Sequence, residues 1–122
     1  MKNNRKKVMI LTNHSYMLYR FRKELIEELM KNYDVVLSMP FVGHHEDFIN
    51  MGLRCIETKM ERRGVNPIHD FSLMKFYKKI LQEENSDLVI TYSIKPNVYG
   101  GLMCEKLNIP FYANVQGLGT AF

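Results

Sequence analysis

The chain has 122 residues, which is enough for one domain of ordinary size and too few for two. Hydrophobic residues make up 46% of it and charged residues 25%, a balance that excludes collagen-like, low-complexity and disordered classes. Seventeen Lys and Arg against thirteen Asp and Glu give a net charge of +4. This charge favours an anionic partner without choosing its kind.

The sequence lacks the 18 consecutive apolar residues of a membrane span, and its basic leader, residues 1–7, is followed by only a short apolar run. We therefore expect a cytoplasmic protein. Nucleic-acid binders usually gather Lys and Arg on one element with aromatic residues between them, so no nucleic-acid partner is expected. Cys55 and Cys104 lack metal-ligand spacing, which predicts buried reduced thiols rather than a disulfide or a zinc site.

Short apolar runs alternate with longer segments of helical period along the chain. The run at 7–12 has the composition of a buried strand, and the segment after it repeats apolar residues at the spacing of an amphipathic helix: Leu18, Phe21, Leu25 and Leu29. The same pattern predicts five strands, at 7–12, 34–39, 53–58, 87–92 and 110–115. Four helices are predicted between them, at 16–31, 45–51, 67–84 and 97–107.

Helices between consecutive strands require the strands to run parallel, and such crossovers are right-handed in nearly all folds. The near-continuous apolar character of the first, second and fourth strands indicates that both faces of the sheet are covered. The predicted fold class is therefore α/β, a doubly wound, Rossmann-like parallel sheet with strand order 3-2-1-4-5. In this order, ligands bind outside the carboxyl ends of the first and fourth strands.

The loop after the first predicted strand joins backbone amides at a helix N-terminus to Asn13 and His14, an arrangement that suits an anionic ligand. His14 is the best single catalytic candidate, and the alternative is that His14 or Ser15 only caps the helix. The adjacent His44 and His45 would point about 100° apart on a helix, so they make a poor metal pair. We interpret them as a solvated helix start, and no metal site is predicted.

Positive charge follows the third and fourth predicted strands. Arg62 and Arg63 lie in a loop that starts at Lys59, and guanidinium groups suit phosphate or carboxylate. The alternative is that this loop only carries the charge expected on any surface loop. After the fourth strand, Lys95 is the residue expected to reach an anion.

Glycines mark the loops after the fourth and fifth strands. Gly100 and Gly101, in the first turn of a helix, each cost about 1 kcal/mol relative to alanine, so either a ligand or a neighbouring helix should approach the backbone there. Gly117 and Gly119 follow the fifth strand. The sequence has neither G-x-G-x-x-G after its first strand nor a P-loop nor the acidic residues of a phospho-receiver domain, so no nucleotide cofactor is expected.

Several strings of the sequence together resemble one protein family. They are VMILTN at 8–13, YRFRKEL at 19–25, RRGVNP at 62–67, TYSIKPNVYGG at 91–101 and NVQGLGTAF at 114–122. In this combination the chain resembles, over nearly its whole length, the N-terminal domain of bacterial family-four glycosyltransferases of the capsular and lipopolysaccharide type. These enzymes have the two-domain GT-B fold.

The resemblance implies a retaining transfer of a hexose from a nucleotide-diphosphate sugar to a polyprenyl-diphosphate-linked or saccharide acceptor in surface polysaccharide synthesis. It implies no cofactor and no bound catalytic metal, and a cytoplasmic location with peripheral contact at the inner membrane face. By position, Asn13 and His14 would line the cleft between domains, and Lys95 and Asn97 would border it. The loop at 117–119 would approach the donor or the acceptor.

The resemblance also implies that residues 1–122 form one truncated acceptor-side domain. In this expectation the C-terminal donor-binding domain, which carries the E-x7-E pattern, is absent. Two interpretations stay open. The chain is part of a glycosyltransferase and inactive by itself, or it is a non-catalytic acceptor-side or membrane-side subunit of a split glycosyltransferase. In an isolated fragment the strand at 110–115 would be an uncovered edge, which favours a homodimer of the fragment.

Overall fold

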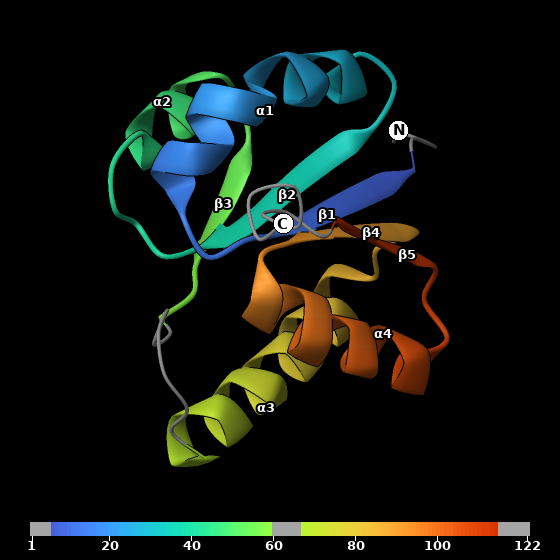
Figure 1. Ribbon diagram of the computed structural model, residues 1–122. Helices are drawn as coiled ribbons and strands as arrows, with labels where there is room; N and C mark the ends of the chain where they lie inside the picture. Colours follow the sequence, from blue (N-terminus) through green and yellow to red (C-terminus); the bar gives the residue numbers. More distant parts are fainter. Residues whose placement is uncertain (1–5, 60–66, 115–122) are drawn as a thin grey trace, which may run out of the picture.

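A computed structural model describes residues 6–59 and 67–114 of the chain, which form a parallel sheet with helices on both faces (Figure 1). The strands are β1 (Lys7–Leu11), β2 (Asp34–Met39), β3 (Arg54–Glu57), β4 (Leu88–Tyr92) and β5 (Phe111–Asn114). The helices are α1 (Ser15–Met30), α2 (His45–Asn50), α3 (Pro67–Glu84) and α4 (Gly101–Leu107), with a π-helical turn, η1 (Pro96–Gly100), leading into α4.

The sheet has the order β3-β2-β1-β4-β5, and every neighbouring pair is parallel. β1 is central, so Leu11 pairs with Ser38 of β2 on one side and with Thr91 of β4 on the other. The predicted α/β class, strand order and element sequence are confirmed.

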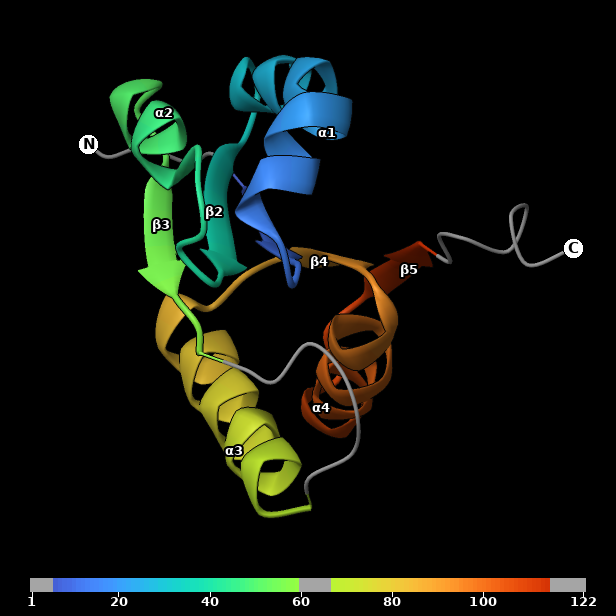
Figure 2. The same cartoon turned by 60° about the vertical axis from the view of Figure 1, so that its left-hand side comes forward.

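Both faces of the sheet are covered by helices (Figures 1 and 2). Successive residues of a strand point to opposite faces, so Val8 and Ile10 join the hydrophobic cluster under α1 and α2, while Met9 and Leu11 join the cluster under α3 and α4. All four side chains are at most 2% exposed. The continuous apolar run of β1 is therefore explained by burial on two sides.

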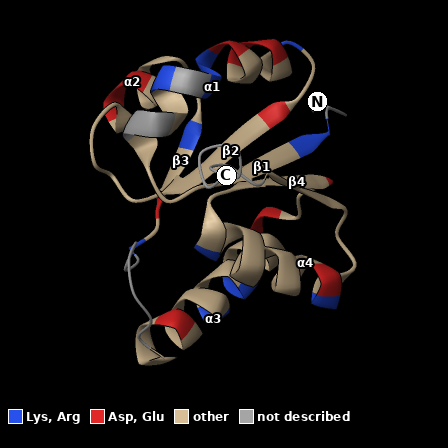
Figure 3. Cartoon of the chain, in the orientation of Figure 1, with Lys and Arg blue, Asp and Glu red and all other residues tan. Residues whose placement is uncertain are grey.

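Charged residues lie mainly on the helices and at the ends of the strands (Figure 3). At the amino edge of the sheet, the Glu84 carboxylate accepts hydrogen bonds from the Arg54 side chain at 2.9 and 3.1 Å and from Lys7 Nζ at 3.3 Å. Asp87 accepts a further bond from the Lys7 backbone amide at 2.8 Å. These contacts fasten the end of α3 to β1 and β3, on the side of the sheet away from the carboxyl ends.

Gly100 and Gly101 pack against the sheet, and this corrects the expectation that a ligand or a neighbouring helix approaches them. A Cβ added at Gly100 would lie 2.6 Å from Leu11 Cδ1, and one at Gly101 would lie 2.9 Å from Phe111 Cε2. The glycines therefore let the start of α4 lie directly on β1, β4 and β5. Two helix-weakening residues are retained there because the helix must come close to the strands.

Both cysteines are free thiols, as predicted, although only Cys104 is fully buried and Cys55 is half-buried. Burial raises the pKa of each thiol to about 11, so both stay protonated at neutral pH. Among the helices that the structure describes, none is both long and apolar enough to cross a membrane.

Candidate functional site at the carboxyl edge of the sheet

The loops after β1, β4 and β5 leave the sheet at the same edge. Leu11 is paired with Thr91, and Tyr92 is paired with Asn114, so the three strand ends lie next to one another. From β1 the chain first builds the sheet in one direction, through β2 and β3, and then on the other side of β1, through β4 and β5. The structure thus brings Asn13, next to the end of β1, to the same edge as the residues that follow β4, as the sequence predicts.

The start of α1 is tied to the loop after β2. Ser15 is fully buried; its hydroxyl donates a hydrogen bond to the Gly43 carbonyl at 2.5 Å and accepts one from the Val42 amide at 3.1 Å. The side chain therefore holds a neighbouring loop. Asn13 and His14, which precede Ser15, are half-buried. Their contact with a ligand stays a prediction.

The chain turns sharply where β4 ends. Ser93 has a φ of 80°, a left-handed conformation that costs a residue other than glycine about 1–3 kcal/mol. The π-helical turn η1 begins three residues later, and its Asn97 amide donates to the Ser93 carbonyl at 2.9 Å. Strained residues and π-helical turns are both frequent at functional sites, so this turn marks the carboxyl edge independently of the strand order.

Asn97 joins the ends of β4 and β5. Its Oδ1 accepts a hydrogen bond from the Thr91 hydroxyl at 2.6 Å, and its Nδ2 donates to the Asn114 carbonyl at 2.8 Å. Asn114 Nδ2 in turn donates to the Thr91 carbonyl at 3.4 Å. The side chain predicted to border a cleft is thus bonded to the ends of β4 and β5.

Lys95 is buried and paired rather than exposed to solvent. Its side chain is 10% exposed, and its Nζ lies 2.9 Å from Asp70 Oδ1 in the first turn of α3. Tyr99 donates a hydrogen bond to the other oxygen of Asp70 at 3.0 Å, and this bond raises the pKa of the Tyr99 phenol. An anion at this edge would have to share the Lys95 ammonium with Asp70, and the predicted contact with an anion stays a prediction.

No family model matches the chain. Over 118 residues it is 25% identical to N,N'-diacetylbacillosaminyl-diphospho-undecaprenol alpha-1,3-N-acetylgalactosaminyltransferase of Campylobacter jejuni, and this match covers 95% of the chain and 31% of that protein. The resemblance to bacterial glycosyltransferases is confirmed. The glycosyltransferase-like chain spans about a third of the length of this relative.

Solved structures show the same fold. A glycosyltransferase from Rickettsia africae superposes with a TM-score of 0.70 at 18% identity, covering 91% of this chain and 30% of that one. A UDP-N-acetylglucosamine 2-epimerase from Rickettsia bellii superposes with a TM-score of 0.67 at 17% identity, covering 90% and 31%. At these identities the likeness establishes the fold alone, which is the parallel α/β fold found in GT-B glycosyltransferases.

Arg22 is a residue of the glycosyltransferase-like chain that sequence reasoning missed. Its guanidinium carbon lies 5.5 Å from the centre of the Tyr92 ring, at the last residue of β4, in a cation–π contact. The residue belongs to the string YRFRKEL, where helical spacing gave no reason to separate it from the other charged residues of α1. Asp70, the partner of Lys95 and Tyr99, is likewise not among the predicted site residues.

The environment of His44 and His45 differs in part from the predicted solvated helix start. His44 stacks on Tyr19 at 4.3 Å between ring centres, and His45 stacks on Phe41 at 4.6 Å. Both histidines are half-buried, because each ring covers an aromatic side chain. The predicted helix start is confirmed, because His44 is the N-cap of α2 and His45 its first residue, but the two rings are stacked and half-buried rather than solvated.

Four predicted site residues lie outside the described residues: Arg62, Arg63, Gly117 and Gly119. Their roles stay predictions. Lys59, where the loop of the two arginines begins, is exposed just beyond the end of β3.

Proposed function

We propose that the chain is the acceptor-side domain of a glycosyltransferase that moves a hexose from a nucleotide-diphosphate sugar to a polyprenyl-diphosphate-linked acceptor in surface polysaccharide synthesis. The observation that carries this proposal is the match over 118 residues to the Campylobacter jejuni protein, whose name specifies sugar transfer to a saccharide on diphospho-undecaprenol. The proposal concerns a whole protein, of which this chain would supply one face of the site.

The chemistry of the carboxyl edge supports this assignment. A donor that leaves as a nucleotide diphosphate needs positive charge or amide dipoles near the departing oxygen, and precise positioning of the reactants supplies much of the remaining acceleration. Arg22, Lys95 and the amides at the start of α1 are groups of this kind. His14 is the group whose ordinary pKa lies near neutrality, and we assign it the catalytic role at this edge.

The same proposal places the protein on the cytoplasmic side of the inner membrane, in peripheral contact with it. A polyprenyl chain stays in the bilayer, so the enzyme must come to the surface to reach the diphosphate. A net charge of +4 favours approach to anionic lipids.

Binding to an acceptor analogue tests the proposal. We would titrate the isotopically labelled chain with a short-chain polyprenyl-diphosphate saccharide and follow the amide resonances by NMR. The expected shifts lie at the carboxyl edge, around His14, Ser93 and Asn114. His14→Ala should weaken the binding, whereas the exposed His69→Ala serves as the matched control. Shifts confined to the amino edge around Glu84 would contradict the proposal.

A further inference from the structure

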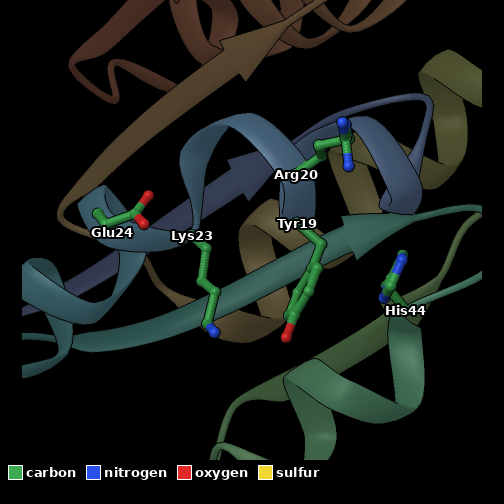
Figure 4. A pocket seen from close by; sticks show the side chains of 5 residues that line it. All are labelled: Tyr19, Arg20, Lys23, Glu24 and His44. Carbon is green, nitrogen blue, oxygen red and sulfur yellow. The ribbon is translucent and has the colours of Figure 1, made fainter.

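A shallow pocket of about 240 Å³ lies between α1 and the loop that leads into α2 (Figure 4). Its lining side chains are Tyr19, Arg20, Lys23, Glu24 and His44. None of them belongs to the residues that the sequence predicts for the site. The pocket nevertheless adjoins the carboxyl edge, because the Ser15 hydroxyl joins the first turn of α1 to the loop that carries His44.

Part of the wall of this pocket is built from side chains that contact one another. Figure 4 shows Lys23 and His44 on opposite sides of Tyr19; the His44 ring stacks at 4.3 Å and Lys23 Nζ lies 5.1 Å from the ring centre. Phe48, which is fully buried, contacts Tyr19 edge to face at 5.3 Å. His44 is held further by Asp47, whose Oδ2 lies 2.7 Å from His44 Nδ1. Side chains held by such contacts lose little entropy when a ligand binds.

The lining groups mix hydrogen-bond donors and acceptors. Arg20 and Lys23 only donate, and ionised Glu24 only accepts. Tyr and neutral His can do both. A sugar hydroxyl also donates and accepts, so a polyhydroxylated ring can satisfy every group in such a set. A phosphate oxygen only accepts, and a phosphate here would meet the carboxylate of Glu24. The two cations would attract a phosphate, but a phosphate cannot bond to Glu24, whereas a sugar hydroxyl can bond to all three charged groups. Hydrogen-bond matching therefore favours a neutral sugar here.

The size of the pocket suits about one sugar ring. Pockets for drug-sized molecules usually measure roughly 300–1,000 Å³, and this one is smaller and open on one side. A nucleotide sugar would extend far beyond it. A single monosaccharide unit with its chain continuing into solvent, or toward the carboxyl edge, matches both the volume and the open side.

We propose that this pocket is a subsite for one neutral sugar unit of the acceptor saccharide, with Arg20, Lys23 and Glu24 as its specificity-determining residues. The inference rests on the proposed function, because it assumes a saccharide acceptor. It goes further by assigning a second place of contact, beside the edge at which transfer would occur. The sugar is held there by its hydroxyl groups.

The test is an NMR titration of the labelled chain with the methyl α-glycoside of N-acetylglucosamine, and separately with inorganic pyrophosphate. The glycoside should shift the amide resonances of Tyr19, Lys23 and His44. Glu24→Gln should raise its Kd about tenfold, because a hydrogen bond to a charged group is lost. Glu28→Gln is the matched control, one turn further along α1 and outside the pocket, and it should leave the Kd unchanged.

Each outcome decides the inference. Shifts in the pocket that Glu24→Gln weakens and Glu28→Gln does not would support it. Pyrophosphate binding in the pocket without glycoside binding would overturn it, as would no glycoside binding at all. If the lipid-linked analogue shifts only the carboxyl edge, the subsite is wrong and the proposed function stands. If the analogue binds nowhere, the proposed function fails.

Discussion

Lys95 shows how a cation near the carboxyl edge is kept in place. Its ammonium group and the Asp70 carboxylate are both removed from water, and Tyr99 supplies a third contact. Such a pair contributes little to stability compared with apolar residues of the same shape. Removing one partner is costly, however, because the other charge stays buried. The pair therefore fixes the position of Lys95 more than it stabilises the fold.

This arrangement predicts an asymmetric response to mutation. Asp70→Ala should lower the free energy of unfolding by about 3 kcal/mol, because the Lys95 ammonium then stays buried without its ion-pair partner. Adding Lys95→Met to that variant should recover much of the loss. Urea denaturation measures both. Asp47→Ala, which removes an exposed partner of His44, should cost less than about 1 kcal/mol. Equal losses in the single and double variants would contradict the explanation.

Single residues of the site could be predicted only in part. The loops that carry His14, Lys95 and Asn97 were assigned to the correct edge, because strand order alone determines where they lie. Their partners could not be predicted, since Asp70 lies 25 positions from Lys95 and no short-range pattern links them. Arg22 escaped notice for the same reason, because its partner Tyr92 belongs to another element.

At the scale of elements, the close contact between the start of the α4 segment and the sheet predicts how substitution of Gly100 changes stability. Gly100→Ala should destabilise the protein by about 1–2 kcal/mol, since overpacking against Leu11 outweighs the helix propensity that alanine gains. Leu11→Val removes part of the clash, so the double variant should lose less than the sum of the single losses. Thermal or urea unfolding of the four proteins gives this coupling. Strict additivity would show that Leu11 is not the obstacle.

The ion pairs of Glu84, at the end of α3, predict that the stability of the fold depends on pH. Burial raises the pKa of Glu84, but hydrogen bonds and attraction from Arg54 and Lys7 outweigh it, so the pKa lies below its usual range. The ionised Glu84 carboxylate therefore stabilises the fold at pH values above about 4.3, which is the pKa of a glutamate in the unfolded chain. This contribution is lost as the pH falls through the pKa of Glu84 in the folded protein. Because Arg54 is exposed, the effect should stay below about 1 kcal/mol.

Urea midpoints of the wild type and of Glu84→Gln, taken between pH 3 and pH 8, check this expectation. The wild type should be the more stable of the two at pH 7, and the difference should shrink in acid. Glu83→Gln, at the exposed neighbouring position, is the control with a matched change of charge. A difference that grows as the pH falls would have the wrong sign.

Elements were easier to predict than their junctions. Apolar runs buried on two faces and helical spacing are local properties of the sequence, and they located every described helix and strand within a few residues. The π-helical turn η1 was missed, because it depends on the sharp turn at Ser93 and on the Asn97 contacts with two strands. The reason for Gly100 was misjudged because the nearest atom belongs to β1, about 90 residues earlier.

At the scale of the whole molecule, the proposed function predicts that the 122-residue chain transfers no sugar by itself. The transfer would take place between this face and a nucleotide-sugar site on a second domain, as the two-domain GT-B resemblance implies. Incubation with labelled nucleotide sugars and membrane extract tests the expectation. Catalytic turnover by the pure chain would contradict it.

Association of the chain with itself is a separate expectation. β5 is an edge of the described sheet, and its Tyr112 is 69% exposed. Open strand edges pair readily with one another, so we expect a two-fold dimer in which the β5 edges meet. Light scattering over a concentration series measures this. Tyr112→Lys, which places a charge on the edge, should shift the protein toward monomer, and a wild type that is monomeric at high micromolar concentration would refute the idea.

The central place of β1 has a consequence for synthesis on the ribosome. Val8 pairs with Val35 on one side but with Leu88 on the other, 80 positions later. At about 5–20 residues per second, the nascent chain waits on the order of ten seconds before its most apolar strand can find its second neighbour. During that interval β2 can cover one edge of β1, β3 pairs only with β2, and the other edge of β1 has no partner strand. The open side is then a surface that a chaperone can bind, and its protection depends on the speed of translation.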